Sequence, residues 1–302
     1  CVWSGSRALS ASPVRGTSGN RYWLPRLAVG TAAAIGAFAS AEVCAAIWKR
    51  VAGEEPGSRD FAGEEWDESW DDASLPQYPP TGDGVEHVEH AAMYAANLIR
   101  SSATSFSSQT RHIFLVRHAE VESTRTGLSK RGLAQAKLTG MKLRAMQERF
   151  GADASLYHSS SEEARATAEV LKSLLTPPEN CTEVPTMSTS LLAEGVPILP
   201  SPLPSALEGM EELSVDFARA DGAFHAFMWR PEGGPQASSM DVIVSHGNTI
   251  RYLVCRALQL PVTAWSRLAV HHCAVTWLEI SADGSVRLLE FGGIGHLSEV
   301  TY

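Results

Sequence analysis

Cysteine is scarce in this chain, with five residues scattered over 302 positions. They show no paired spacing, which argues against a cysteine-based metal cluster and predicts a reducing compartment. An initiator methionine is also lacking, because the sequence begins with Cys1. We therefore expect the natural N-terminus to be missing from this sequence.

Acidic residues are absent from residues 1–41, which carry four arginines and many Ser, Ala and Gly. A basic, acid-free start of this kind is typical of a mitochondrial transit peptide. The balance reverses over residues 54–90, where a dozen Asp and Glu accompany a single Arg. The net charge of -9 therefore comes largely from an acidic linker and less from the surface of a folded domain. It argues against nucleic acid as a partner.

Residues 27–48 are rich in Ala and Gly and contain only one charged residue, Glu42. As a helix this stretch would be about 33 Å long, enough to cross a bilayer core. The sequence thus predicts a membrane helix at 27–48, after a transit-like segment at 1–26. Because alanine is only weakly hydrophobic, an extended signal segment or an interfacial helix is the alternative. Basic residues flank both ends, so the orientation stays open.

Two short apolar runs end abruptly in a histidine. One leads into Arg117 and His118, and the other into His246. Such runs are typical of buried parallel strands, whose carboxyl ends form the ligand-binding edge of an open α/β sheet. A lone histidine at a strand end is more often structural, but the Arg-His pair and the repeated pattern favour function. One imidazole can attack phosphorus while the other histidine and the guanidinium neutralise its oxygens.

Strand-like and helix-like stretches alternate along the second part of the chain. This alternation predicts an α/β fold with three layers, in which helices cover both faces of a mostly parallel sheet. We expect strands near 111–117, 154–158, 182–186, 241–245, 273–280 and 286–291, and helices near 129–147, 162–175, 206–228 and 248–259.

The same residues resemble the histidine phosphatase superfamily, also called phosphoglycerate mutase-like, whose signature is Arg-His-Gly or Arg-His-Ala after the first strand. Leu128–Ala136 is similar to the opening of the family's first helix, and residues 158–160 to its second strand end. Residues 245–247 match its second histidine. The resemblance covers residues 111 to about 291 and implies the phosphoglycerate mutase-like fold, with one antiparallel edge strand. It implies no metal or organic cofactor.

The resemblance also assigns roles to single residues. His118 would be the nucleophile that forms a phosphohistidine, and Arg117 and His246 would hold the phosphoryl oxygens. Glu194 lies in a Leu-Leu-x-Glu-Gly context that is similar to the family's general-acid position, although a loop glutamate is usually just solvated. Phosphoproteins would be the substrates.

One position departs from the family pattern. The ungapped alignment places Glu163 where the family has its second phosphate-binding arginine, and Arg165 follows two residues later. Two residues turn a helix by about 200°, so Arg165 would point away from the phosphate. Either the helix begins two residues later and returns Arg165 to the phosphate, or the chain is a weakened or inactive phosphatase.

Two tryptophan-aspartate pairs, Trp66-Asp67 and Trp70-Asp71, lie in a segment too acidic to fold alone. In a helix both indoles would share one face, and exposed tryptophans favour burial against the chain's own domain or another subunit. The pattern resembles a mitochondrial, membrane-bound serine/threonine protein phosphatase branch of the superfamily. In that branch the motif drives homo-oligomer assembly and activates the enzyme. That branch usually has Asn where this chain has Ser69.

These observations predict four segments: residues 1–26, the membrane helix 27–48, an acidic linker 49–110 with the Trp-Asp motif and a short helix, and a histidine phosphatase domain 111–302. We expect a phosphatase of phosphoserine and phosphothreonine in a mitochondrial membrane. The alternative is a pseudophosphatase that serves as an oligomeric scaffold. A small-molecule phosphatase or a mutase is a third hypothesis, and the mutase-type extension is absent after Arg117-His118.

Overall fold

The computed structural model describes residues 66–67, 69–71, 85–102, 108–122, 127–179, 181–208 and 214–298. The expected transit-like segment, the membrane helix at 27–48 and most of the acidic linker lie outside these residues. Within the described ranges, no helix combines the length and the apolar character needed to span a bilayer.

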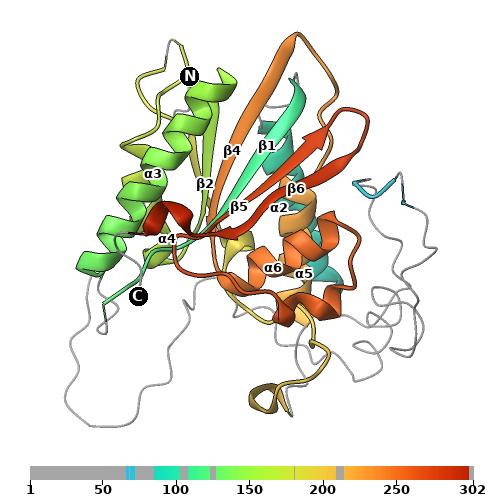
Figure 1. Ribbon diagram of the computed structural model, residues 1–302. Helices are drawn as coiled ribbons and strands as arrows, with labels where there is room; N and C mark the ends of the chain where they lie inside the picture. Colours follow the sequence, from blue (N-terminus) through green and yellow to red (C-terminus); the bar gives the residue numbers. More distant parts are fainter. Residues whose placement is uncertain are drawn as a thin grey trace, which may run out of the picture. The chain divides into compact units, whose positions relative to one another are not determined.

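A six-stranded sheet forms the centre of the domain (Figure 1). Its strands lie in the order β3-β2-β4-β1-β5-β6. The four strands from β3 to β1 are parallel, as the alternation of strands and helices predicted. The strand bounds are β1 (Ser108–Arg117), β2 (Ala154–Ser159), β3 (Thr186–Thr189), β4 (Gln236–Ser245), β5 (Val275–Ser281) and β6 (Val286–Gly293).

The antiparallel strand is not at the edge of the sheet, contrary to the expectation from the family resemblance. β5 runs antiparallel to both β1 and β6, and β6 forms the edge. A tight turn reverses the chain between them, with Gly284 at a φ of 87° and the Ser281 amide donating to Ser285 O. Positive φ values favour glycine, so the glycine at position 284 explains why the chain can turn tightly here.

Helices cover both faces of the sheet, which gives the expected three layers (Figure 1). Phe114 and Val116 of β1 pack in the apolar cluster under α3 and α4, while Ile113 and Leu115 face the cluster under α2, α5 and α6. This alternation follows from the two-residue period of a strand. The helices are α2 (Val85–Ser102), α3 (Lys130–Phe150), α4 (Glu162–Lys172), α5 (Ser214–Phe227) and α6 (Gly247–Ala257).

Three element starts differ clearly from the sequence-based expectation: those of β3, of α5, and of β4, which begins at Gln236 rather than near 241. β3 begins at Thr186 rather than near 182, directly after Pro185, which has no amide to donate to a sheet. α5 begins at Ser214 rather than near 206, and a short 3-10 helix, Ser205–Leu207, follows Pro204 instead.

The described cysteines do not all behave as the scattered spacing suggested. Cys255 and Cys273 are buried free thiols, and burial raises their thiol pKa values to about 11 and about 12, which makes both unreactive. Cys181, in contrast, is disulfide-bonded. The scattered spacing gave no indication of this bond.

The Trp-Asp motif docks on the chain's own domain as a turn, not as a helix. The buried Trp70 ring packs edge-on against Phe224, and its indole N–H donates to Gly284 O over 2.9 Å. The Asp71 carboxylate accepts from the Arg230 amide at 2.7 Å and from its guanidinium at 2.8 Å. Trp66 lies 6.5 Å from Trp70, measured between ring centroids, and stays 36% exposed.

Candidate functional site

The carboxyl ends of β1 and β4 bring the two sequence-predicted histidines together. The strands pair in a register that sets Arg117 opposite Ser245, so His118 and His246 both follow directly. The His118 amide donates to Ser245 O over 2.9 Å, and the two imidazole centroids lie 5.0 Å apart. Parallel pairing at the ligand-binding edge of the sheet is thus what creates the site.

His118 is poised as a nucleophile. Its Nδ1 lies 2.9 Å from Ala119 O, and because a carbonyl oxygen only accepts, Nδ1 must carry the proton. The neutral ring therefore keeps its free lone pair on Nε2. Burial lowers the pKa of His118, and the nearby Arg117 charge lowers it further. The imidazole is consequently neutral at neutral pH.

His246 is also held neutral, at the N-terminus of α6. It is buried, and its Nε2 lies 3.1 Å from Ser159 Oγ and 3.2 Å from Ser161 Oγ. Burial, together with the charges of His118, Arg219 and Arg117, lowers the pKa of His246 to about 3. It can thus act on a phosphoryl oxygen as a hydrogen-bonding group, without a full positive charge.

Two arginines flank Gly247, and both point unused donors toward the site. A Cβ built on Gly247 would lie 3.8 Å from Arg117 Nε and 3.8 Å from Arg251 Cζ. Arg117 donates from Nη1 to Val270 O, and Arg251 from Nη1 to Asn248 Oδ1. Among the described residues, neither Nε has a hydrogen-bond partner although both are buried. Paired unsatisfied guanidinium donors are suited to an anion.

For Arg251, early in the helix after His246, the sequence allowed an approach to the phosphate but favoured a surface or domain contact. The signal that points to the site is its spacing from Gly247, because residues four apart share one face of a helix. Arg251 supplies a second positive charge close to Arg117: burial lowers the pKa of Arg117, and the charge of Arg251 lowers it further.

Glu194 lies on the loop after a 3-10 helix, η3 (Ser190–Leu192). Its Oε1 accepts from the Asn248 amide over 3.1 Å, and its Oε2 lies 3.8 Å from His246 Nδ1. Although its side chain is 43% exposed, partial desolvation of the carboxyl group raises the pKa of Glu194, in the direction that a general acid needs. Arg219, another residue that the sequence did not reveal, holds this loop by donating to Leu191 O and Ala193 O.

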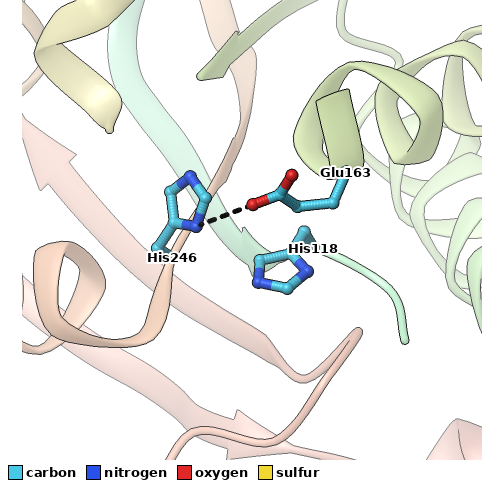
Figure 2. Close-up of side chains that lie close together, drawn as sticks. All are labelled: His118, Glu163 and His246. Carbon is cyan, nitrogen blue, oxygen red and sulfur yellow. Dashed lines mark ion pairs between the residues drawn. The ribbon is translucent and has the colours of Figure 1, made fainter. Parts of the chain in front are cut away.

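Glu163, not Arg165, faces the histidines (Figure 2). α4 begins at Glu162 with Ser161 as its N-cap, and a Glu163 carboxylate oxygen lies 3.9 Å from His246 Nδ1. Thr167 Oγ1 accepts from the Ala119 amide over 2.9 Å, which fixes the register of the helix.

Arg165 lies elsewhere. It is exposed and pairs with Glu162 at 2.6 Å. The alternative in which a later helix start returns Arg165 to the phosphate is therefore not what the structure shows, and the histidine pair has a carboxylate beside it instead.

The structure also contains a cavity of about 110 Å³. One of its lining residues is His272, whose ring lies 5.2 Å from the His118 ring. Sequence reasoning identified neither His271 nor His272 as a site residue. The lining residues are Glu120, Arg131, Gln135, His271, His272, Ile294 and Leu297.

Comparisons with known proteins agree with this geometry. A family model described as histidine phosphatase superfamily (branch 1) matches residues 203–291. The chain is 36% identical over 199 residues to the human protein named serine/threonine-protein phosphatase PGAM5, mitochondrial, which covers 62% of this chain and 64% of that protein. The corresponding mouse protein is 35% identical with the same coverage.

More distant relatives match over a longer span. The Pgam5 protein of Drosophila mojavensis is 32% identical over 244 residues, which cover 77% of this chain and 78% of that protein. Among solved structures, phosphoglycerate mutase from Plasmodium falciparum is 29% identical, covers 61% of this chain and 92% of its own, and has a TM-score of 0.44. The match spans just under two thirds of the length of the mammalian relatives. The chain belongs to the PGAM5 family within the histidine phosphatase superfamily.

Proposed function

We propose that this chain is a phosphoprotein phosphatase that acts on phosphoserine and phosphothreonine through a phosphohistidine. The observation that carries the proposal is the neutral His118, with its free Nε2 lone pair beside His246 at the edge of the sheet. The names of its relatives as mitochondrial serine/threonine-protein phosphatases support this substrate class.

The reaction has two steps. His118 Nε2 attacks phosphorus, the bond from phosphorus to the substrate oxygen breaks, and protonated Glu194 gives its proton to the leaving alkoxide. Water then attacks the phosphorus of the phosphohistidine, Glu194 takes up a proton from that water, and inorganic phosphate leaves with His118 restored. Arg117 and Arg251 bind the non-bridging oxygens throughout, and His246 hydrogen-bonds to them.

Glu163 works against this chemistry. A carboxylate about 4 Å from a phosphate oxygen costs roughly 4 kcal/mol per unit charge at an effective dielectric of 20. We infer that turnover is slow compared with a site that has arginine there. The same residue carries the second candidate function, a pseudophosphatase that keeps the fold and serves as an oligomeric scaffold.

We further propose that the chain is tethered to a mitochondrial membrane through residues 27–48 and assembles through the Trp-Asp motif. Support for the tether comes from the composition of that stretch and from the mitochondrial names of the relatives. Support for assembly comes from Trp66, which remains partly exposed on the docked motif.

The test is turnover of a phosphoserine peptide, with acid-labile phosphoenzyme trapped during the reaction. We expect His118→Ala to abolish both signals, since the substitution removes the Nε2 lone pair that forms the phosphohistidine. His90→Ala, which changes an exposed histidine on α2, is the matched control and should retain activity. Turnover that survives His118→Ala rejects this nucleophile.

Glu163→Arg separates the two candidate functions. Losing one oxyanion donor costs about 10²–10³ in kcat, so replacing the carboxylate by a donor should raise turnover by a comparable factor. The matched control is Glu162→Arg, which changes an exposed residue of the same helix turn. A gain specific to Glu163→Arg indicates a site weakened by this one residue. No gain in an inactive wild-type protein favours the scaffold.

A further inference from the structure

Glu163, the carboxylate that disfavours phosphate binding, completes a set of metal ligands. His118, Glu163 and His246 each offer one ligand atom, and these atoms all lie within 4.8 Å of one another (Figure 2). The three residues come from β1, α4 and the start of α6, so the fold itself brings them together. Two imidazoles and one carboxylate form a common ligand set of zinc sites that keep a fourth position open.

We propose that His118, Glu163 and His246 form a binding site for a divalent transition-metal ion such as Zn²⁺, and that the bound ion blocks the nucleophile. The second half of this proposal rests on the proposed function, whereas the binding of the ion does not.

Both imidazoles already have the outer hydrogen bonds that a metal site requires. A ligating histidine usually donates its other ring N–H to an oxygen, which fixes the ring and the tautomer. His118 does so from Nδ1 to Ala119 O at 2.9 Å. His246 has Ser159 Oγ and Ser161 Oγ at 3.1 and 3.2 Å from Nε2, which leaves Nδ1 toward Glu163. Because both rings stay neutral, binding needs no proton to leave either imidazole.

The distances leave a small movement to be made. Ligands at about 2.0–2.2 Å from a tetrahedral zinc ion are roughly 3.3–3.6 Å apart, compared with 3.9 Å between His246 Nδ1 and Glu163 Oε1 and with separations of up to 4.8 Å within the set of three, so His118 must also move toward the ion. The Glu163 side chain is one third exposed, so a rotation of its carboxylate can close the gap. Glu194, with Oε2 at 3.8 Å from the same nitrogen, is available as a further ligand.

The nearby charges are mixed. Burial lowers the pKa of both histidines, and positive charges that would also oppose a cation add to it: Arg117 for His118, and Arg219 and Arg117 for His246. Glu163 and Glu194 favour a cation, and each brings a carboxylate oxygen within 4 Å of His246 Nδ1. The Arg117 guanidinium also donates to Val270 O, which engages one of its nitrogens. Two carboxylates therefore lie close enough to His246 to offset part of this positive charge.

Metal binding and phosphoryl transfer compete in this site. The attack on phosphorus uses the only free lone pair of His118, and a coordinated metal ion occupies a lone pair of the same ring. A bound ion therefore excludes the phosphohistidine. It does so reversibly, so the ion would act as a competitive inhibitor with respect to the phosphopeptide.

The experiment is a Zn²⁺ titration of the purified full chain, stripped of metal and competed against a chromogenic zinc chelator. We expect one equivalent to bind to the wild type and Glu163→Gln to weaken that binding at least about 10-fold, because the carboxylate is a direct ligand. Glu162→Gln, the exposed neighbour on α4, is the matched control. Equal affinities of Glu163→Gln and Glu162→Gln overturn the proposal.

A measurement on the wild type covers the case in which a variant fails to fold. Zn²⁺ should protect His118 and His246 from carbethoxylation, followed by peptide mass mapping, and leave the exposed His271 reactive. Equal labelling of His118 and His246 with and without Zn²⁺ excludes the site.

Activity assays separate the metal site from the proposed function. Phosphopeptide turnover that Zn²⁺ inhibits competitively, and a chelator restores, supports both. Zn²⁺ binding that depends on Glu163, in a chain without turnover under any condition, supports the metal site and rejects the phosphatase. Turnover without Glu163-dependent binding, or turnover that bound Zn²⁺ increases, rejects the inhibitory site and leaves the phosphatase standing.

Discussion

At the scale of single residues, the site combines two charges of opposite sign. Glu163 brings a carboxylate to the histidine pair, while Arg251 brings a guanidinium from α6. The electrostatic field on a bound phosphate therefore has a repulsive contribution from α4 and an attractive contribution from α6.

Arg251→Gln tests whether that donor acts on the substrate. We expect turnover of a phosphopeptide to fall by about 10²-fold, mainly in kcat, because one charged donor to the transition state is lost. The measurement is steady-state kinetics, with Arg165→Gln, whose guanidinium pairs with Glu162 on the surface, as control. Equal effects of the two substitutions contradict a role for Arg251 in the site.

The pH profile follows from two pKa shifts of opposite direction. His118 must be neutral to attack, and burial lowers its pKa below the ordinary 6.5, so the acid limb lies below pH 6.5. Glu194 must be protonated to donate, and burial raises its pKa above the ordinary 4.5, so activity falls as pH rises through that raised pKa. We expect kcat/KM for a phosphopeptide to peak in the acid range; an acid limb centred above pH 6.5 contradicts this.

A change of leaving group identifies the general acid. Glu194→Gln should slow hydrolysis of a phosphoserine peptide by about 10²–10⁴-fold, the usual contribution of such a group. An aryl phosphate whose leaving group needs no proton should be affected far less. Equal losses with both substrates show that Glu194 has a different role.

At the scale of elements, the approach of α3 to the loop after β1 depends on one glycine. A Cβ on Gly132 would lie 1.9 Å from Glu120 O, and the Glu120 carboxylate accepts from Ser129 and Arg131 at the start of the same helix. The chain after His118 is thus held by the first turn of α3. This contact gives a physical reason for the glycine in the Leu128–Ala136 pattern.

Gly132→Ala should therefore destabilise the domain by about 1–3 kcal/mol, as overpacking against backbone does, and should shift the loop that follows the nucleophile. Urea-induced unfolding measures the first effect and phosphopeptide turnover the second. Gly127→Ala is the control, since nothing lies within 4 Å of a Cβ there. Similar stabilities of the two variants would show that the loop after His118 can move away from α3 at little cost in free energy.

The elements that the sequence predicted well are those with a local signal. The apolar runs of β1 and β4 end at histidines because buried parallel strands present their carboxyl ends to ligands, so the pair at 5.0 Å was foreseeable. The position of β5 inside the sheet was not. It depends on contacts between residues far apart in the sequence, which leave no periodic trace.

At the scale of the whole molecule, the Trp-Asp motif is tied to the domain at several points, including the backbone of Asp67, which exchanges hydrogen bonds with the Gln259 side chain. Trp70 is anchored at the turn between β5 and β6, and Asp71 is anchored at Arg230, beyond α5. The sequence left two alternatives open: burial on the chain's own domain or on another subunit. Both would bury the same indole, that of Trp70. The described residues show the first arrangement.

The stability of a Trp70→Ala variant distinguishes docking on the chain's own domain from docking on another subunit. If the motif docks on its own domain, the loss of a buried indole should lower the free energy of unfolding by about 3–5 kcal/mol, whereas Trp66→Ala, at 36% exposed, should lower it much less. Chemical denaturation measures this, and sedimentation gives the oligomeric state. A Trp70→Ala protein of unchanged stability that no longer assembles shows that the indole belongs to an intersubunit contact.

The placement of Glu163 in the first turn of α4 has a consequence for stability as well as for catalysis. Acidic side chains are favourable beside the partial positive charge at a helix N-terminus, by about 0.3–1 kcal/mol each, and arginine is unfavourable there. Glu162 and Glu163 both occupy this turn. An arginine at position 163 would therefore yield a quicker but less robust protein.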